Sequence, residues 1–130
     1  MKRRQAREKA IQSLFQIDVS EVNREDAISH VLNEDEGKDD FLVQLVEGTT
    51  DHLDEIDETI KQHLERWSFD RIGNVDRSVL RLAVFEMLFI EEIPINVTFN
   101  EAIDLAKTFG GDESGRFVNA VLSKISKSFQ

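Results

Sequence analysis

Basic residues crowd the first nine positions of the chain, where they outnumber a single acid: Lys2, Arg3, Arg4, Arg7 and Lys9 stand against Glu8. This segment carries a net charge of +4, whereas the other 121 residues carry −14 of the total of −10. Arginine forms forked hydrogen bonds with phosphates and stacks on exposed bases. The segment is therefore a candidate site for RNA, while the acidic remainder suits a basic protein partner. A basic end that only increases solubility is the alternative.

A second candidate site lies near the end of the chain, around Phe117. A helical wheel places this ring at the margin of an apolar stripe, with Arg116 and Lys124 on the polar side. An exposed aromatic ring gives an unpaired base a stacking surface. The alternative is that Phe117 belongs to the core and that the two basic residues are ordinary solvated surface.

No arrangement of residues is typical of an enzyme or a metal site. His30, His52 and His63 form neither an HExxH motif nor the Glu-x-x-His pairs of a di-iron bundle. The carboxylates between residues 51 and 58 fall on the outer face of a predicted helix, where solvation explains them. Gly110-Gly111 lacks the Lys-Ser/Thr that follows in a phosphate-binding P-loop. We therefore expect no catalytic residue, no metal and no cofactor.

Length and composition indicate a single domain over residues 1–130, large enough to bury a core without disulfides or metals. The chain has no cysteine, which excludes thiolate metal sites and permits a reducing compartment. Its charged opening is unlike a signal peptide. We expect a cytoplasmic protein that does not enter a membrane.

The element expected to position the candidate sites is a core helix over residues 74–93. Between residues 79 and 90 only Arg81 and Glu86 are not apolar, which is typical of a helix surrounded by other helices. The apolar run is shorter than the about 20 residues that a membrane span requires.

Capping residues predict where this helix and the next one begin. Asn74 is the expected N-cap of the core helix, and Asp76 places negative charge at its positive end. Pro94 should end the helix, because proline disfavours helical geometry in the residue before it. Thr98 and Glu101 form a predicted capping box for the following helix.

Elsewhere, apolar residues recur three and four positions apart, and sustained alternation is absent. We predict about seven helices, no strands and an all-α fold. Besides the core helix, the expected segments cover about residues 4–19, 23–32, 40–50, 53–67, 98–110 and 112–129. A break is expected near Gly48, and Trp67 and Phe129 are expected to extend the buried faces of their helices.

The chain resembles the NusB family of bacterial transcription antitermination factors over nearly its whole length, and four segments carry the resemblance. They read RRQAREKAIQSLFQIDVS, NVDRSVLRLAVFEM, IPINVTFNEAIDLAKTFG and ESGRFVNAVLSKI. The last two are the most specific, with Arg116 where the family often has lysine. The resemblance implies two packed helical bundles. It also implies binding of the boxA segment of nascent RNA, together with the ribosomal protein NusE, during ribosomal RNA transcription.

The resemblance also assigns site residues. The RNA-binding positions it implies are Lys2, Arg3, Arg4, Arg7, Glu113, Arg116 and Phe117. The positions it implies for NusE are Asp70, Asp76 and Arg77. Phe15 stands where relatives can have tyrosine, so a hydroxyl contact there would be absent. The expected partners are boxA RNA, NusE and the transcription elongation complex, and the expected state is a monomer or a homodimer.

Two other functions remain open at this stage. One is that of a relative of the NusB-like domain of ribosomal RNA cytosine methyltransferases, although 130 residues leave no room for a catalytic domain that binds a cofactor. The other is a helical module that binds proteins and no RNA. A salt-dependent RNA affinity would separate the second alternative from RNA recognition.

Overall fold

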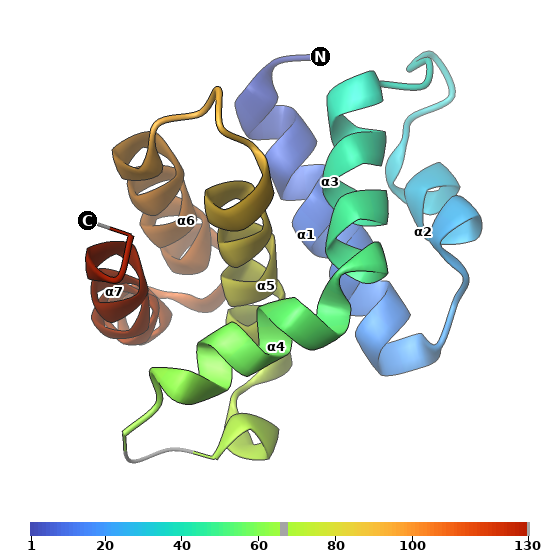
Figure 1. The fold of residues 1–130 in the computed structure, drawn as a ribbon. Helices are drawn as coiled ribbons and strands as arrows, with labels where there is room; N and C mark the ends of the chain where they lie inside the picture. The colour runs from blue at the N-terminus through green and yellow to red at the C-terminus, as the bar shows by residue number, and fades with distance from the viewer. Residues whose placement is uncertain (66–67, 130) are drawn as a thin grey trace.

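The computed structural model describes residues 1–65 and 68–129, and in these ranges the chain forms seven α-helices, one short 3₁₀ helix and no strand (Figure 1). The all-α prediction is confirmed. In chain order the elements are α1 (Arg3–Ser20), α2 (Arg24–Val31), α3 (Asp40–Asp51), α4 (Leu53–Gln62), η1 (Phe69–Arg71), α5 (Asn74–Phe89), α6 (Ile95–Gly110) and α7 (Asp112–Lys127). The prediction for Trp67 lies outside the described residues.

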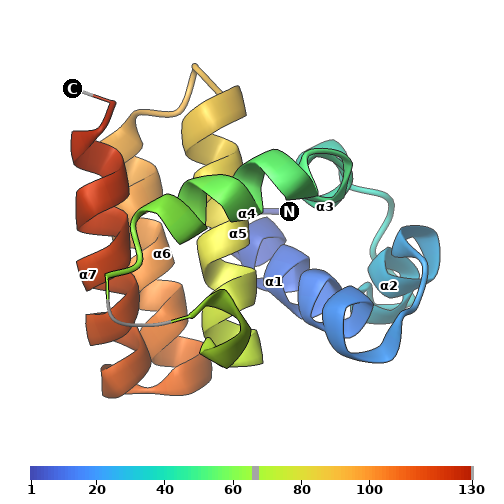
Figure 2. The same ribbon diagram turned by 60° about the horizontal axis from the view of Figure 1, so that its bottom comes forward.

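The helices form two packed groups that share α5 as their common support. Helices α1, α2 and α3 contact one another on one side. On the other side α5, α6 and α7 run side by side and α4 crosses α5 (Figure 2). Both α1 and α3 also pack against α5. The expectation of two helical bundles within one domain is therefore confirmed.

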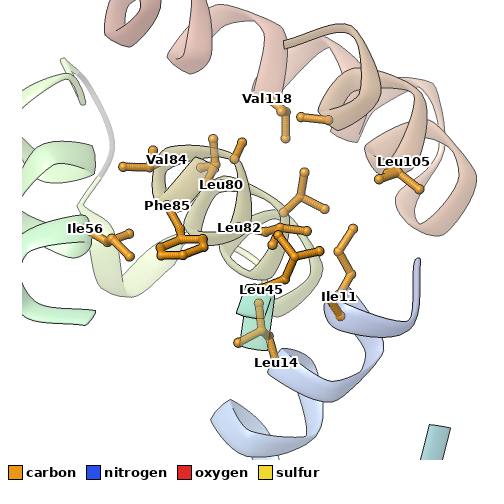
Figure 3. Packing of buried hydrophobic residues seen from close by; sticks show 14 of the residues in the cluster. Ile11, Leu14, Leu45, Ile56, Leu80, Leu82, Val84, Phe85, Leu105 and Val118 are labelled. Atoms are coloured by element: carbon orange, nitrogen blue, oxygen red, sulfur yellow. The ribbon is translucent and has the colours of Figure 1, made fainter. Parts of the chain in front are cut away.

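Helix α5 is the predicted core helix, and it is buried along most of its length. From Ser78 to Glu86 every residue except Arg81 is buried. Figure 3 shows side chains from α1, α3, α4, α6 and α7 gathered around this helix. An apolar helix of this kind is stable in water only because its neighbours cover it on nearly all sides.

Two of the predicted helix starts are wrong. Gly73, and not Asn74, is the N-cap of α5, and the Asn74 side chain instead accepts a hydrogen bond from Arg77 Nη2 at 2.6 Å. Helix α6 starts directly after Pro94, because proline fits the start of a helix, where no amide partner is needed. Thr98 therefore lies inside α6 and caps nothing.

Two further predictions about α3 and α7 are also corrected. The break expected around Gly48, Thr49 and Thr50 lies slightly later in the chain, because α3 continues to Asp51, the chain turns at His52 and α4 begins at Leu53. Gly48 itself lies inside α3. Glycine is needed at this position because the Phe85 ring lies against the backbone, where a Cβ atom would overlap it. Phe129 is 38% exposed and does not extend the buried stripe of α7.

A buried ion pair joins α1 to α5 at the centre of the molecule. Arg7 Nε and Nη2 donate to Glu86 Oε2 and Oε1 at 3.0 and 2.8 Å. The Thr98 hydroxyl of α6 donates to Glu86 Oε1 at 3.0 Å. Arg7 is 4% and Glu86 2% exposed, so water screens this interaction little. Three helices are thus connected through one carboxylate.

Removing one partner of this pair is expected to destabilise the fold strongly. Glu86→Ala leaves the Arg7 guanidinium buried without a counter-charge, which typically costs about 3–5 kcal/mol. The double variant Arg7→Met/Glu86→Leu should recover most of that loss, because neither charge remains. Unfolding in denaturant measures both effects.

Arg4→Ala serves as the control for removing an exposed arginine from α1, and it should cost less than about 1 kcal/mol. A Glu86→Ala protein that is no less stable than Arg4→Ala would contradict the central role of the buried pair.

Candidate nucleic-acid interface

The predicted basic residues Lys2, Arg3 and Arg4 are exposed around the start of α1. The Lys2 backbone N–H donates to Gln5 Oε1 at 3.3 Å. The Arg3 guanidinium carbon lies 4.4 Å from the centre of the Phe41 ring of α3, a cation–π distance. This contact orients Arg3 while the side chain remains open to water, so it is accessible to a phosphate.

Arg4 is held by two carboxylates of α6. Its Nη2 atom donates to Glu101 Oε1 at 3.0 Å and to Asp104 Oδ2 at 3.1 Å. The hydrogen bonds to Glu101 and then to Asp104 raise the pKa of Arg4 above its usual value. The Arg4 side chain is 44% exposed, and exposed ion pairs typically contribute about 0.2–1 kcal/mol. Arg4 can therefore leave these carboxylates at small cost.

Arg7 lies in a different environment from the one that its sequence position indicates. The expectation that it overhangs the edge of the core as part of an RNA-binding surface assumes an exposed side chain, whereas the structure buries it against Glu86. The helical wheel correctly places Arg7 on the core side. There Arg7 binds Glu86 of α5, which is 79 positions away in the chain, so the contact is structural.

On α7, Phe117 is half-buried and packs against the core. The prediction of partial exposure is confirmed. The ring lines two hollows, one with His63, Leu64 and Lys124 and the other with residues of η1, α5 and α7. No residue of α1 lines either hollow. The structure thus places the predicted RNA-binding residues in two separate groups.

The basic residues beside Phe117 differ in their surroundings. Arg116 is exposed, as expected for a residue on the polar side of α7. Lys124 Nζ lies 2.8 Å from Glu65 Oε1 in the segment after α4. The hydrogen bond from Lys124 lowers the pKa of the Glu65 carboxyl. Lys124 is therefore partly neutralised, and Arg116 is the more accessible cation.

The second hollow, here called the α5–α7 hollow, brings predicted RNA-binding and partner-binding residues together. Its volume is about 250 Å³, and its lining includes Asp76, Glu113 and Phe117. Asp76 Oδ1 is buried and accepts no hydrogen bond from the described part of the chain. A buried carboxylate oxygen without a donor is unfavourable.

The other predicted partner-binding residues, Asp70 and Arg77, lie close to this hollow in the chain but differ in accessibility. Asp70 is exposed on η1. Arg77 donates through Nε to Asp18 Oδ2 at 3.2 Å and through Nη2 to Asn74 Oδ1 at 2.6 Å. Its side chain is 15% exposed, so its main role in this structure is to join α5 to α1.

Sequence patterns do not reveal the ion-pair network that joins α5 to α4 and α1. Arg81 donates to both oxygens of Asp57 on α4 at 2.8 Å, and its Nη1 atom lies 3.3 Å from Asp18 Oδ1 on α1. Burial lowers the pKa of Arg81, but the hydrogen bonds and charges of Asp57 and Asp18 outweigh it, and the net shift is upward. The only sequence signal was a charged residue within an apolar helix.

Over residues 1–65 and 68–129, no helix combines the length and apolar character needed to cross a membrane. In the same ranges, no group of three or more histidine or carboxylate side chains is arranged to bind a metal ion.

Comparisons with known proteins agree on one family. The model of the NusB family matches residues 4–127. The transcription antitermination protein NusB of Bacillus subtilis is 55% identical over 130 residues, which are all of this chain and 98% of the relative. The crystal structure of T. maritima NusB matches with a TM-score of 0.88 at 38% identity, over 98% of this chain and 92% of the other.

A second solved structure contains antitermination factors NusB and NusE in complex with double-stranded RNA. It matches with a TM-score of 0.87 at 35% identity, covering 97% of this chain and 96% of the matched chain.

Proposed function

The chain belongs to the NusB family of transcription antitermination proteins, and from this premise we propose that it binds the boxA segment of nascent RNA together with NusE. The observation that carries the proposal is the group of exposed cations around the start of α1 in a protein whose net charge is −10. We define Lys2, Arg3 and Arg4 as the basic pole. A polyanion is attracted to this pole and repelled by the acidic remainder.

RNA recognition requires more than phosphate contacts, and Phe117 supplies the second element of the proposal. A half-buried aromatic ring is held rigidly on its core side, and its accessible part is suited to stacking with an unpaired base. Arg116 lies one position away on α7 and is exposed to a phosphate. Glu113 lines the same hollow as Phe117 and would face the RNA or its protein partner.

The acidic surface around the α5–α7 hollow is the proposed site for NusE. A ribosomal protein is typically basic, and charge complementarity favours rapid and correctly oriented association. The place of Asp76 in the lining of the hollow supports this assignment, as does the exposure of Asp70. Arg77 would act indirectly, by holding α5 against Asp18 of α1.

The proposed setting is the transcription elongation complex in the cytoplasm, where nascent ribosomal RNA is available. The chain is not an enzyme, since the relatives that it matches over their full length are transcription antitermination proteins. A module that binds only proteins is disfavoured by the basic pole, and the methyltransferase-associated relative by the full-length match to separate NusB proteins.

The affinity for a boxA-type RNA, measured with and without NusE at a series of salt concentrations, tests the ligand and the partner together. The protein alone should bind RNA, and NusE should increase the affinity. Lys2→Ala and Arg3→Ala should each weaken binding and flatten the plot of log affinity against log salt by about 0.7 for each lost phosphate contact.

Lys127→Ala removes an equal charge at the C-terminal end of α7, outside the basic pole, and should leave that slope unchanged. Equal effects of Lys127→Ala and Arg3→Ala would mean that RNA responds only to overall charge, and this would refute a defined basic pole.

Phe117→Ala is expected to weaken RNA binding by about 1–3 kcal/mol, the usual contribution of one stacking surface. Because the ring is half-buried, its truncation should cost less stability than the about 3–5 kcal/mol of a fully buried phenylalanine. RNA titration and denaturant unfolding measure the two effects. The adjacent Val118→Ala, which alters a residue with 0% exposure, should reduce stability and spare RNA affinity. The reverse pattern for Phe117 would identify it as a core residue only.

Asp76→Asn should weaken NusE binding by roughly 1.5–3 kcal/mol, because it removes the charge that a cationic partner group would meet. Asparagine retains the shape of the side chain. Calorimetric titration with NusE gives the affinity, with Glu58→Gln on α4 as a control of equal charge change. If NusE affinity is unchanged and only the melting temperature falls, the role of Asp76 is structural.

A further inference from the structure

Two arginines of α1, Arg4 and Arg7, stand nearly one turn apart, and each is bound by carboxylates of other helices. The inner residue, Arg7, is 4% exposed, and its partner Glu86 is 2% exposed. The outer residue, Arg4, is 44% exposed, and its partners Glu101 and Asp104 are 23% and 54% exposed. Another anion can therefore replace the carboxylates bound to Arg4 more easily than the carboxylate bound to Arg7.

The outer contacts occupy a residue of the proposed RNA-binding surface. Both carboxylates bind the same Arg4 atom, Nη2, at 3.0 and 3.1 Å. A phosphate that approaches this atom meets two negative charges within a few ångströms, and like charges at such distances repel each other. RNA can bind Nη2 only by displacing these carboxylates, and their charges also oppose a phosphate at the remaining N–H groups of Arg4.

Glu101 is poorly satisfied even while it binds Arg4. Its second oxygen, Oε2, is buried and has no hydrogen-bond partner among the described residues. A buried carboxylate oxygen without a donor disfavours the present arrangement. Glu101 also lies on α6 one turn after Thr98, which is bound to Glu86, so the backbone that carries it is fixed. Exchange would therefore require side-chain motion only.

We propose that Glu101 and Asp104 compete with RNA phosphates for Arg4 and thereby lower the RNA affinity of the free protein. This inference rests on the proposed RNA-binding function. It adds Glu101 and Asp104 as residues that restrain RNA binding, although no residue of α6 is expected to contact RNA. In the bound state Arg4 turns from the two carboxylates to a phosphate, while Arg7 remains with Glu86.

The test is the affinity of a boxA-type RNA for the double variant Glu101→Gln/Asp104→Asn, in the presence and absence of the further change Arg4→Met. With Arg4 present, the double variant should bind about threefold to tenfold more tightly than the unaltered protein. With methionine at position 4, most of this gain should disappear. The expected difference between the two gains is at least about threefold.

This comparison separates competition for Arg4 from a general reduction of negative charge. Asp54→Asn/Glu55→Gln on α4 changes the net charge by the same amount at exposed positions outside the contacts of Arg4, and it should alter the affinity little. Equal gains with and without Arg4 would overturn the inference. Weaker RNA binding by Glu101→Gln/Asp104→Asn would overturn it as well, since the carboxylates would then hold Arg4 in its binding position.

Folding and function have separate readouts. Thermal unfolding should change little, because the contacts are exposed and the substitutions keep the side-chain shapes. Asp104→Asn alone, at the more exposed of the two positions, should give a smaller gain in the same direction. If the unaltered protein binds RNA and the variants bind no better, only this inference fails. Absence of RNA binding by every protein, with and without NusE, would refute the proposed function and this inference together.

Discussion

The position of α1 depends on the buried pair formed by Arg7 and Glu86. Apolar side chains pack α1 against α5, but such contacts are non-directional and allow small rotations and shifts of a helix. The bidentate ion pair between Arg7 and Glu86 is directional, and Glu86 also accepts a hydrogen bond from the Thr98 hydroxyl. These contacts fix the angle and register of α1 relative to α5 and α6. Because Lys2, Arg3 and Arg4 precede Arg7 by one turn or slightly more, their place on the surface follows from this buried contact.

The same scaffold carries the proposed recognition residues at two places. The basic pole lies around one end of α1, whereas the α5–α7 hollow contains Asp76 at the first turn of α5 and Phe117 on α7. Elsewhere on α5, Arg81 joins Asp57 of α4 to Asp18 of α1, and Arg77 also binds Asp18. Charged residues inside the packed helices thus fix the framework, and those at its surface remain available to ligands. Burial decides which of the two roles a given arginine has.

Much of the fold follows from patterns that are local in the chain. Apolar spacing predicted the helices and the central place of α5. The caps of α2 and α3 are local as well, since side-chain oxygens of Asn23 and Asp39 accept amide hydrogen bonds at 2.9 Å. Errors arose where the deciding partner is distant or where several residues can start a helix. Local patterns do not show that Arg7 is buried, because its partner Glu86 is 79 positions away in the chain. The Thr98 and Glu101 pattern resembled a capping box, yet proline starts α6 and the two side chains bind Glu86 and Arg4. The hollow that joins Asp76 to Glu113 and Phe117 depends on tertiary packing that local patterns do not contain.

A buried arginine anchors α1, while we propose that an exposed arginine on the same helix exchanges its carboxylate partners for RNA phosphates. Nuclear magnetic resonance of the arginine Nε–Hε groups, recorded before and after addition of boxA-type RNA, observes both residues in one sample. The Arg7 signal should keep its chemical shift and its slow exchange with water, because Glu86 and the surrounding core protect it. The Arg4 signal should shift as its partners change. A shifted, faster-exchanging Arg7 signal together with an unchanged Arg4 signal would contradict the account, since Arg7 would then have left Glu86 to bind the RNA.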